Sequence, residues 1–377
     1  MRFVATADWQ LGMTAHFLDD DARPRFQAAR LDAVRRIGRL ARERDAAFVV
    51  VCGDVFESNQ LDRAIVGRTF EALRTFDVPV VLLPGNHDPL DAASIYSSRA
   101  FLDRVPEHVH VLRDAAPFQV APGVEVVGAP WFSKRPVQDL VGAAIVQVEP
   151  APPGVVRVLA GHGAVSTLSP DRDDPSAVDV ANLQAALSDG RAHVAVLGDR
   201  HSTLEVAPRI WYPSTPEVTD RRETDPGNVL VIDVDAASGE VSVEKVHVGT
   251  WRFEVVTERL DSAADVEALE QRLDALPHKD CTAIWLALSG TLSTAAYARL
   301  EAVLEEAEPL FAWLDRWQRH NDLAVLPDDH DFADLPLSGF ARAALDELTQ
   351  LASADDDGAP VARDALALLY RYARSGR

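Results

Sequence analysis

Cysteine is scarce in this chain of 377 residues, which contains only Cys52 and Cys281. Two cysteines cannot form the disulfide framework of a small secreted protein, and Cys52 lies within an apolar run that is expected to be a core strand. We therefore exclude a disulfide scaffold and expect the protein to work in a reducing compartment, the cytoplasm.

A long apolar run is also lacking. The first apolar run covers residues 2–6, with no basic segment ahead of it, and no run approaches the ~20 residues needed to cross a bilayer. We expect neither secretion nor a membrane partner. No internal repeat is visible, and 377 residues with 47% hydrophobic content are enough for more than one domain with a substantial core.

Positive charge is the third deficit. The chain has 37 Lys and Arg against 59 Asp and Glu, a formal net charge of −22, and such a protein repels a phosphate backbone at long range. Acidic tracts at residues 19–21, 171–174 and 355–357 are expected to be solvated loops. This chain alone is not expected to hold DNA tightly. The candidates for local phosphate contacts are Lys134, Arg135 and Arg200.

Five short apolar runs, in which Val is prominent, each end in a polar turn. Runs of this length and composition are typical of strands buried on both faces, and in open α/β sheets binding sites form beyond the carboxyl ends of the strands. Asn oxygen, imidazole and carboxylate groups can all bind divalent cations. The five turns are Asp8-Trp9-Gln10, Gly53-Asp54, Gly85-Asn86-His87-Asp88, Gly161-His162 and Gly198-Asp199-Arg200-His201.

The order of these turns resembles the signature of the calcineurin-like metallophosphoesterases, over about residues 1–250. Within that superfamily the chain looks most like nuclease subunits of the SbcD type and their double-strand-break-repair relatives. Residues 7–12 are similar to a family segment that usually reads Asp-Trp-His-Leu-Gly, and residues 211–217, Trp-Tyr-Pro-Ser-Thr-Pro-Glu, are similar to the segment after the last ligand strand.

The resemblance implies two divalent metal ions bridged by Asp54, with Mn²⁺ expected and Fe²⁺ or Mg²⁺ as alternatives. It implies that His87 stays off the metals and donates a proton or a hydrogen bond to the phosphoester oxygen, while Asp88 orients its imidazole. The remaining implied ligands are Asp8, Gln10 and His201 for one ion, and Asn86, His162 and Asp199 for the other.

Two of these residues depart from the family pattern. Gln10 stands where the family usually has a histidine ligand, and a neutral amide oxygen is a weaker donor than an imidazole. Asp199 stands where the family has the first histidine of its Gly-His-x-His motif, and it adds a negative charge that favours a harder, oxygen-preferring cation. A second interpretation of Gln10 is that it only hydrogen-bonds to the ligands.

The predicted fold is α/β, a calcineurin-like metallophosphoesterase β-sandwich flanked by helices, with a small C-terminal α/β capping domain and terminal helices. We place the catalytic domain at residues 1–250, the capping domain at 251–330 and a helical segment at 331–377. Apolar residues in that last segment either pack on their own domain or, as the resemblance implies, dock onto a partner. Predicted helices cover residues 21–43, 61–74, 264–273 and 294–307, and a hairpin covers 229–248. Asp21 is the expected cap of the first helix, and Ser58 or Asn59 that of the second.

Three functions stay open at this point. The first is a Mn²⁺-dependent DNA nuclease in DNA repair, working with an SbcC-type, SMC-like ATPase subunit. The oligomeric state, including a homodimer, stays open. The second is a phosphodiesterase or phosphatase acting on a small phosphoester, which the acidic charge favours. The third is a scaffold subunit with degenerate metal sites, suggested by Gln10 and Asp199.

Overall fold

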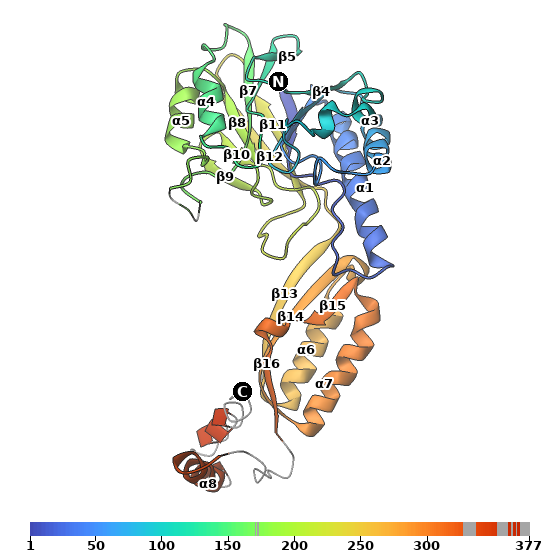
Figure 1. The fold of residues 1–377 in the computed structure, drawn as a ribbon, viewed down its shortest axis with the longest axis vertical. Coiled ribbons are helices and arrows are strands. Elements are labelled where there is room, and N and C mark those ends of the chain that lie inside the picture. Colours follow the sequence, from blue (N-terminus) through green and yellow to red (C-terminus); the bar gives the residue numbers. More distant parts are fainter. Residues whose placement is uncertain are drawn as a thin grey trace. The chain divides into compact units, whose positions relative to one another are not determined.

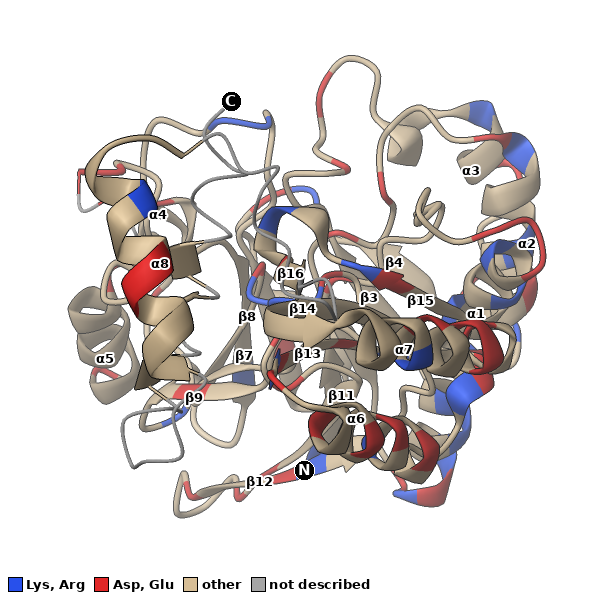
Figure 2. Ribbon diagram, turned by 90° about the horizontal axis from the view of Figure 1, so that it is seen from below, with Lys and Arg blue, Asp and Glu red and all other residues tan. Residues whose placement is uncertain are grey.

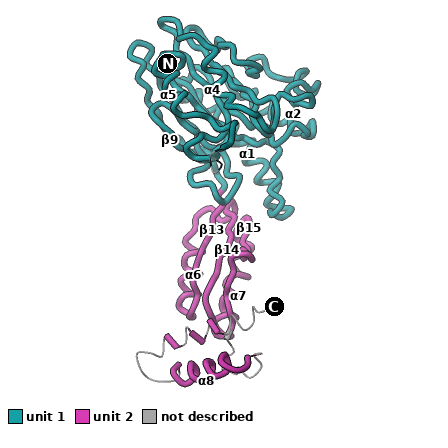
Figure 3. Tube along the Cα trace, turned by 60° about the vertical axis from the view of Figure 1, so that its left-hand side comes forward, with its two compact units in different colours: residues 1–251 teal, residues 252–377 magenta. Residues whose placement is uncertain are grey.

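The computed structural model describes residues 1–169, 171, 173–326 and 337–352, and the pairs 361–362, 365–366 and 368–369. The chain divides into two compact units, Met1–Trp251 and Arg252–Arg377 (Figure 3). Each unit is described by itself below. Among the described residues, no helix is both long enough and apolar enough to span a membrane.

The first unit contains two six-stranded sheets (Figure 1). The first has the order β12-β11-β1-β2-β3-β4, in which β1 to β4 are parallel and β11 and β12 form an antiparallel hairpin against β1. The hairpin confirms the one predicted from the sequence. The strands are β1 (Arg2–Thr6), β2 (Val49–Cys52), β3 (Val80–Leu83), β4 (Val109–Val111), β11 (Asn228–Val234) and β12 (Val241–His247).

The second sheet has the order β5-β6-β7-β8-β10-β9, with four parallel strands, β6, β7, β8 and β10, between two antiparallel edge strands. Both central strands, β7 and β8, are buried along their whole length, as their Val-rich runs predict. The strands are β5 (Phe118–Ala121), β6 (Val124–Gly128), β7 (Val156–His162), β8 (Val194–Gly198), β9 (Leu204–Ala207) and β10 (Ile210–Tyr212).

The two sheets pack face to face, with helices on both outer faces. Alternation along the strands produces this layering: Phe3 packs into the core between the sheets, whereas its neighbour Val4 packs with the helices on the outer face. The first sheet is covered by α1 (Ala22–Glu43) and α2 (Arg63–Leu73), near the short α3 (Arg99–Leu102), and the second by α4 (Leu140–Val146) and α5 (Val180–Ser188). The predicted β-sandwich flanked by helices is confirmed.

The helix starts differ from the predicted caps. The amides of Asp21 and Ala22 donate to the Asp19 carboxylate, so Asp19 caps α1 in place of Asp21. Likewise, Asp62 caps α2 by accepting from the amide of Ala64, and the predicted caps at residues 58 and 59 were wrong. Several acidic and polar residues precede each helix, and the sequence does not show which one the loop brings to the first free amides.

The second unit is a parallel sheet with helices packed on it (Figure 1). Its long central strand β14 (Thr282–Ser293) pairs with β13 (Arg252–Leu260) on one side, and on the other with β15 (Trp313–Arg316) and then β16 (Asp322–Leu326). Helices α6 (Ala263–Ala275) and α7 (Thr294–Ala307) pack on the sheet through Leu and Val residues. A further helix, α8 (Phe340–Ala352), lies in the region predicted to be helical, of which part falls outside the described residues.

A buried carboxylate holds together the loops at one end of the first unit. Glu217 is fully buried and accepts hydrogen bonds from the amides of Thr250 and Trp251, and from a guanidinium nitrogen of Arg36 at 2.8 Å. The buried guanidinium of Arg30 binds the carbonyl oxygen of Glu217 and also that of Trp9. The loop after β10 is therefore fixed to α1 and to the loop after β1.

We predict that Glu217→Ala destabilises the protein by about 3 kcal/mol, because two backbone amides and a half-buried guanidinium lose their acceptor. The free energy of unfolding in urea measures this loss. The control is Arg44→Ala, which removes an exposed ion pair with Glu244 and should cost less than about 1 kcal/mol. Equal effects of the two substitutions would contradict the anchoring role of Glu217.

Candidate metal centre

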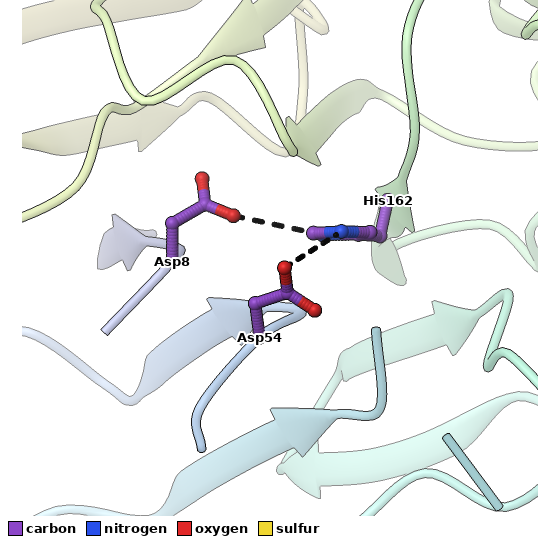
Figure 4. A group of neighbouring side chains, drawn as sticks. All are labelled: Asp8, Asp54 and His162. Carbon is purple, nitrogen blue, oxygen red and sulfur yellow. Dashed lines mark ion pairs between the residues drawn. The ribbon is translucent and has the colours of Figure 1, made fainter. Parts of the chain in front are cut away.

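The polar residues that follow the strands meet at one edge of the two facing sheets. The donor atoms of Asp8, Asp54 and His162 lie within 4.8 Å of one another, and all three side chains are buried (Figure 4). The strands that position the predicted ligands are β1 for Asp8 and Gln10, β2 for Asp54, β3 for Asn86, β7 for His162, and β8 for Asp199 and His201.

Three glycines permit this convergence. A Cβ atom at Gly53 would lie 2.0 Å from Nδ1 of His162, and one at Gly85 would lie 2.2 Å from Oδ1 of Asp54. A Cβ atom at Gly198 would lie 1.9 Å from the carbonyl oxygen of Cys52. A side chain at these positions would therefore displace the ligands or the backbone next to them, which explains why these three turns contain glycine beside the polar residue.

The backbone at the site is strained. Among the described residues, ten other than glycine have positive φ, and five of these are predicted ligands. Such conformations are uncommon outside glycine and are retained mainly where the surrounding structure enforces them, often at functional sites. Hydrogen bonds between the two ligand loops, including that from the amide of Gln10 to the carbonyl of Asp54 at 2.9 Å, hold this geometry. The five are Asp8 (54°), Gln10 (42°), Asp54 (52°), Asp199 (99°) and His201 (56°).

The orientation of the His162 ring leaves one nitrogen for a cation. Nδ1 lies 2.9 Å from the carbonyl oxygen of Cys52, which can only accept, so Nδ1 carries the hydrogen. Nε2 then faces two oxygens, Oδ1 of Asn86 at 2.7 Å and Oδ2 of Asp54 at 3.4 Å. In the neutral ring Nε2 carries no hydrogen, so it and the two oxygens all present lone pairs to one another. A metal ion bound between them would stabilise this arrangement.

His201 is oriented by a carboxylate. Its Nδ1 lies 2.9 Å from Oε1 of Glu223 and 2.7 Å from the hydroxyl of Thr219, and this hydroxyl also donates to Glu223. Its Nε2 lies 3.3 Å from the Gln10 side-chain amide and 3.8 Å from Oδ1 of Asp8. A carboxylate behind a histidine fixes the ring and raises its basicity toward a metal. Sequence reasoning missed Glu223, because no motif distinguishes it from an acidic residue of a solvated loop.

Asp199 lies beside the cluster and is partly exposed. Its amide donates to both carboxylate oxygens of Asp8, at 3.0 and 3.1 Å, and its own Oδ1 lies 4.0 Å from Nε2 of His162. The structure therefore brings all seven predicted ligands to one place, including Gln10 and Asp199, which depart from the family pattern. In this set every side chain offers oxygen or imidazole nitrogen and none offers thiolate, which suits Mn²⁺, Fe²⁺ or Mg²⁺.

His87 lies next to the cluster and is half exposed. Its backbone amide donates to Oδ1 of Asp54 at 2.9 Å, and its ring Nδ1 lies 2.9 Å from the carbonyl oxygen of Glu57. That carbonyl only accepts, so the hydrogen is on Nδ1, and Nε2 lies 3.9 Å from Oδ2 of Asp54.

The role predicted for Asp88 was wrong. Asp88 is fully buried and accepts hydrogen bonds from the amides of Gly85 and Phe56, at 2.8 and 3.0 Å, and from the hydroxyl of Tyr96 at 2.6 Å. The carbonyl of Glu57, and not Asp88, orients the His87 ring. Asp88 instead ties the turn after β3 to the loop after β2. Burial and the nearby Asp54 charge raise the pKa of Asp88 to about 6.

The electrostatics of the cluster favour positive charge at its centre. Burial raises the pKa of Asp8 to about 6, although the two imidazoles oppose this. Burial lowers the pKa of His201, but the carboxylates of Asp8 and Glu223 outweigh it and raise that pKa to about 9. The cluster thus stabilises either protons on its imidazoles or a cation bound among its carboxylates, and the residues present fit a divalent metal.

Comparisons with known proteins point to one family. A family model described as "Calcineurin-like phosphoesterase" matches residues 1–232. A search of curated protein sequences gave no match. Matches among solved structures include a Thermus thermophilus protein, at 10% identity and a TM-score of 0.40, with 66% of this chain and 98% of that one covered. A dimetal phosphatase from Danio rerio matches at 14% identity and a TM-score of 0.37, with 62% of this chain and 92% of that one covered. A purple acid phosphatase from yellow lupin, Lupinus luteus, matches at 13% identity and a TM-score of 0.35, with 66% of this chain and 53% of that one covered.

We predict that Asp54→Ala removes the bound metal, because two cations that share this carboxylate would repel each other without it. Elemental analysis of the purified variant should find the metal-to-protein ratio close to zero. The control is Asp45→Ala, an exposed aspartate with positive φ at the opposite end of β2, which should keep the wild-type ratio. Full metal content in the Asp54 variant would contradict a shared carboxylate.

Proposed function

This chain belongs to the calcineurin-like phosphoesterase family, whose members hydrolyse phosphoesters at a metal centre, and we propose that it is a metal-dependent DNA nuclease acting in DNA repair with an SbcC-type ATPase subunit. The observation that carries this proposal is the convergence of seven oxygen and nitrogen donors from five strand ends, with His87 beside them and half exposed to solvent.

Two further features favour a nuclease over a phosphatase for small substrates. The segment of residues 211–217, similar to its counterpart in SbcD-type nucleases, ends in Glu217, which anchors the loop to α1 and to residues 250–251. A separate α/β unit follows the catalytic unit, in the place where those nucleases carry their capping domain. The net charge of −22 favours the alternative, a small phosphoester, and acidic residues along α6 and α7 (Figure 2) add to it.

The chemistry divides between the metals and the chain. When bound, two such ions supply an activated water and stabilise both the attacking and the leaving oxygen of an in-line displacement. The ligand set would hold them, with Asp54 shared, while Cys52 and Glu223 fix the two imidazoles through their Nδ1 hydrogens. The Glu57 carbonyl holds the Nδ1–H of His87, so Nε2 faces the site. When the ring carries a second proton, its Nε2–H is the group that would donate a proton or hydrogen bond to the phosphoester oxygen.

The ATPase partner would bind the terminal helices. On α8, Phe340 is 89% exposed and Leu351 is 47% exposed, whereas Leu345 is buried against Leu366. The helix is therefore apolar both on the side that it buries and at exposed positions near its two ends. An amphipathic helix with this composition fits the groove or coiled coil of a partner protein.

The proposed function is tested by hydrolysis of labelled single- and double-stranded DNA, beside bis-p-nitrophenyl phosphate and p-nitrophenyl phosphate, with Mn²⁺, Fe²⁺, Mg²⁺ and Zn²⁺ in turn. We expect DNA cleavage that depends on Mn²⁺. Hydrolysis of the small esters without cleavage of either DNA would establish the alternative, a small-molecule phosphoesterase. A metal-loaded protein that hydrolyses none of the four substrates would support the scaffold interpretation.

We predict that His87→Ala lowers kcat on bis-p-nitrophenyl phosphate by about 10²- to 10⁴-fold, the usual cost of losing a general acid, and leaves metal content near the wild-type level. The His87 ring has no described contact with a ligand closer than 3.9 Å, so its removal should not disturb the cluster. Loss of metal together with activity would make His87 a ligand and refute the assignment.

We predict that Phe340→Glu combined with Leu351→Glu abolishes co-purification with the ATPase subunit and leaves hydrolysis of bis-p-nitrophenyl phosphate unchanged. A matched control is Val146→Glu, which changes an apolar residue of α4 that is 63% exposed and lies in the catalytic unit. This control should still bind the ATPase. Unimpaired binding by the α8 double variant would refute the partner dock.

A further inference from the structure

Trp131, which follows β6, is fixed directly against the metal centre. Its indole Nε1 donates to the carbonyl oxygen of His162 at 2.9 Å, and its ring meets the His162 imidazole edge to face with centroids 5.7 Å apart. Its backbone amide donates to Pro84 at 3.1 Å, and its carbonyl accepts from Leu90 at 2.7 Å. Trp131 is thus joined to the His162 turn and to both sides of the turn that carries Asn86 and His87.

The residues that follow Trp131 form an exposed loop. Phe132, one residue on and therefore about 3.8 Å away at its Cα atom, has 54% of its surface exposed. Lys134 and Arg135 are also exposed, and within the described part of the chain neither has a hydrogen bond or an ion pair. In a protein with a net charge of −22, these two unpaired cations offer a phosphate a local attraction, and Phe132 offers an exposed aromatic face one residue from Trp131.

We propose that Phe132, Lys134 and Arg135 form a substrate subsite at the rim of the metal centre, in which Phe132 stacks on a nucleobase of a single strand and the two cations contact a neighbouring phosphate. This proposal rests on the proposed nuclease function and deepens it, because it assigns recognition of a base-bearing strand to one loop.

The chemistry of the three side chains selects this ligand. An aromatic face stacks on any base, so the contact needs no sequence preference, and removing such a contact weakens binding by about 5- to 150-fold. Lysine and arginine beside the ring attract the phosphate of the strand and offset the repulsion by the acidic cluster. A simple phosphomonoester would use the cations but would leave the exposed phenyl ring without a role.

Trp131 gives the subsite its position. Because the backbone and the indole of Trp131 are both tied to the turns that carry Asn86, His87 and His162, the start of the loop at residue 132 is held next to these turns. A base stacked on Phe132 would therefore belong to a nucleotide close to the phosphodiester that is cleaved, which is where stacking raises the effective concentration of the substrate.

The test compares hydrolysis of a short oligothymidylate with that of an oligonucleotide of the same length built from abasic residues, using the full-length, Mn²⁺-loaded protein. We expect the wild type to have the higher kcat/KM on oligothymidylate. Phe132→Ala should lower the ratio of the two kcat/KM values by about 5- to 150-fold, through KM, and Phe132→Tyr should restore it. A matched control is Val137→Ala, which changes a residue of the same loop that is 84% exposed and should keep the wild-type ratio.

A separate measurement, the salt dependence of KM, tests the contribution of Lys134 and Arg135. Lys134→Gln combined with Arg135→Gln should flatten the dependence of KM on salt concentration for both oligonucleotides, since two phosphate contacts are lost. An unchanged ratio in Phe132→Ala, with wild-type cleavage of both substrates, would overturn the subsite alone. A wild type that hydrolyses bis-p-nitrophenyl phosphate but neither oligonucleotide would overturn the nuclease function and the subsite together.

Discussion

The structure of the first unit depends on the burial of two carboxylates, Asp8 and Asp54, within a few ångströms of one another and of a buried imidazole. Like charges in a site of low dielectric constant repel strongly, so the arrangement persists only with compensating positive charge. Three features of the site accompany the placement of these groups together. They are the positive φ angles of five ligands, the glycines that leave no room for a Cβ atom, and the hydrogen bond from Nδ1 of His162 to the carbonyl oxygen of Cys52. The metal ions of the family would supply the missing charge.

The acidic composition of the chain has a related meaning. A protein with a net charge of −22 gains little from long-range attraction to a phosphate backbone, so binding of a nucleic acid would rely on local contacts and on a partner. The proposed local contacts lie in the loop after Trp131, where Lys134 and Arg135 are exposed. In the function proposed above, the ATPase subunit would hold the DNA and this chain would hydrolyse it, a division of work that agrees with the charge balance.

Much of the fold and the identity of the clustered residues could be predicted from the sequence, because both depend on local patterns. The apolar run at residues 2–6 and the helical pattern at residues 294–307 predicted β1 and α7 at their observed limits, and the polar turns after five runs do meet at one edge. The predicted helix caps and the role of Asp88 failed for a different reason. Which acceptor reaches a free amide, and which carbonyl holds an imidazole, depends on loop conformations that no local pattern encodes. Glu223 and Trp131 act through contacts across long stretches of sequence and were missed for the same reason.

The most direct test of the central claim, that these strand ends form a centre for two metal ions, is a crystal structure of the wild-type protein with Mn²⁺, using the anomalous signal to locate the ions. We expect two peaks roughly 3.5–4 Å apart with the Asp54 carboxylate between them, and with the side chains of His162 and His201 binding one ion each through Nε2. Peaks that lie away from these residues, or a single peak at full occupancy with Asp54 bound to that ion alone, would contradict it.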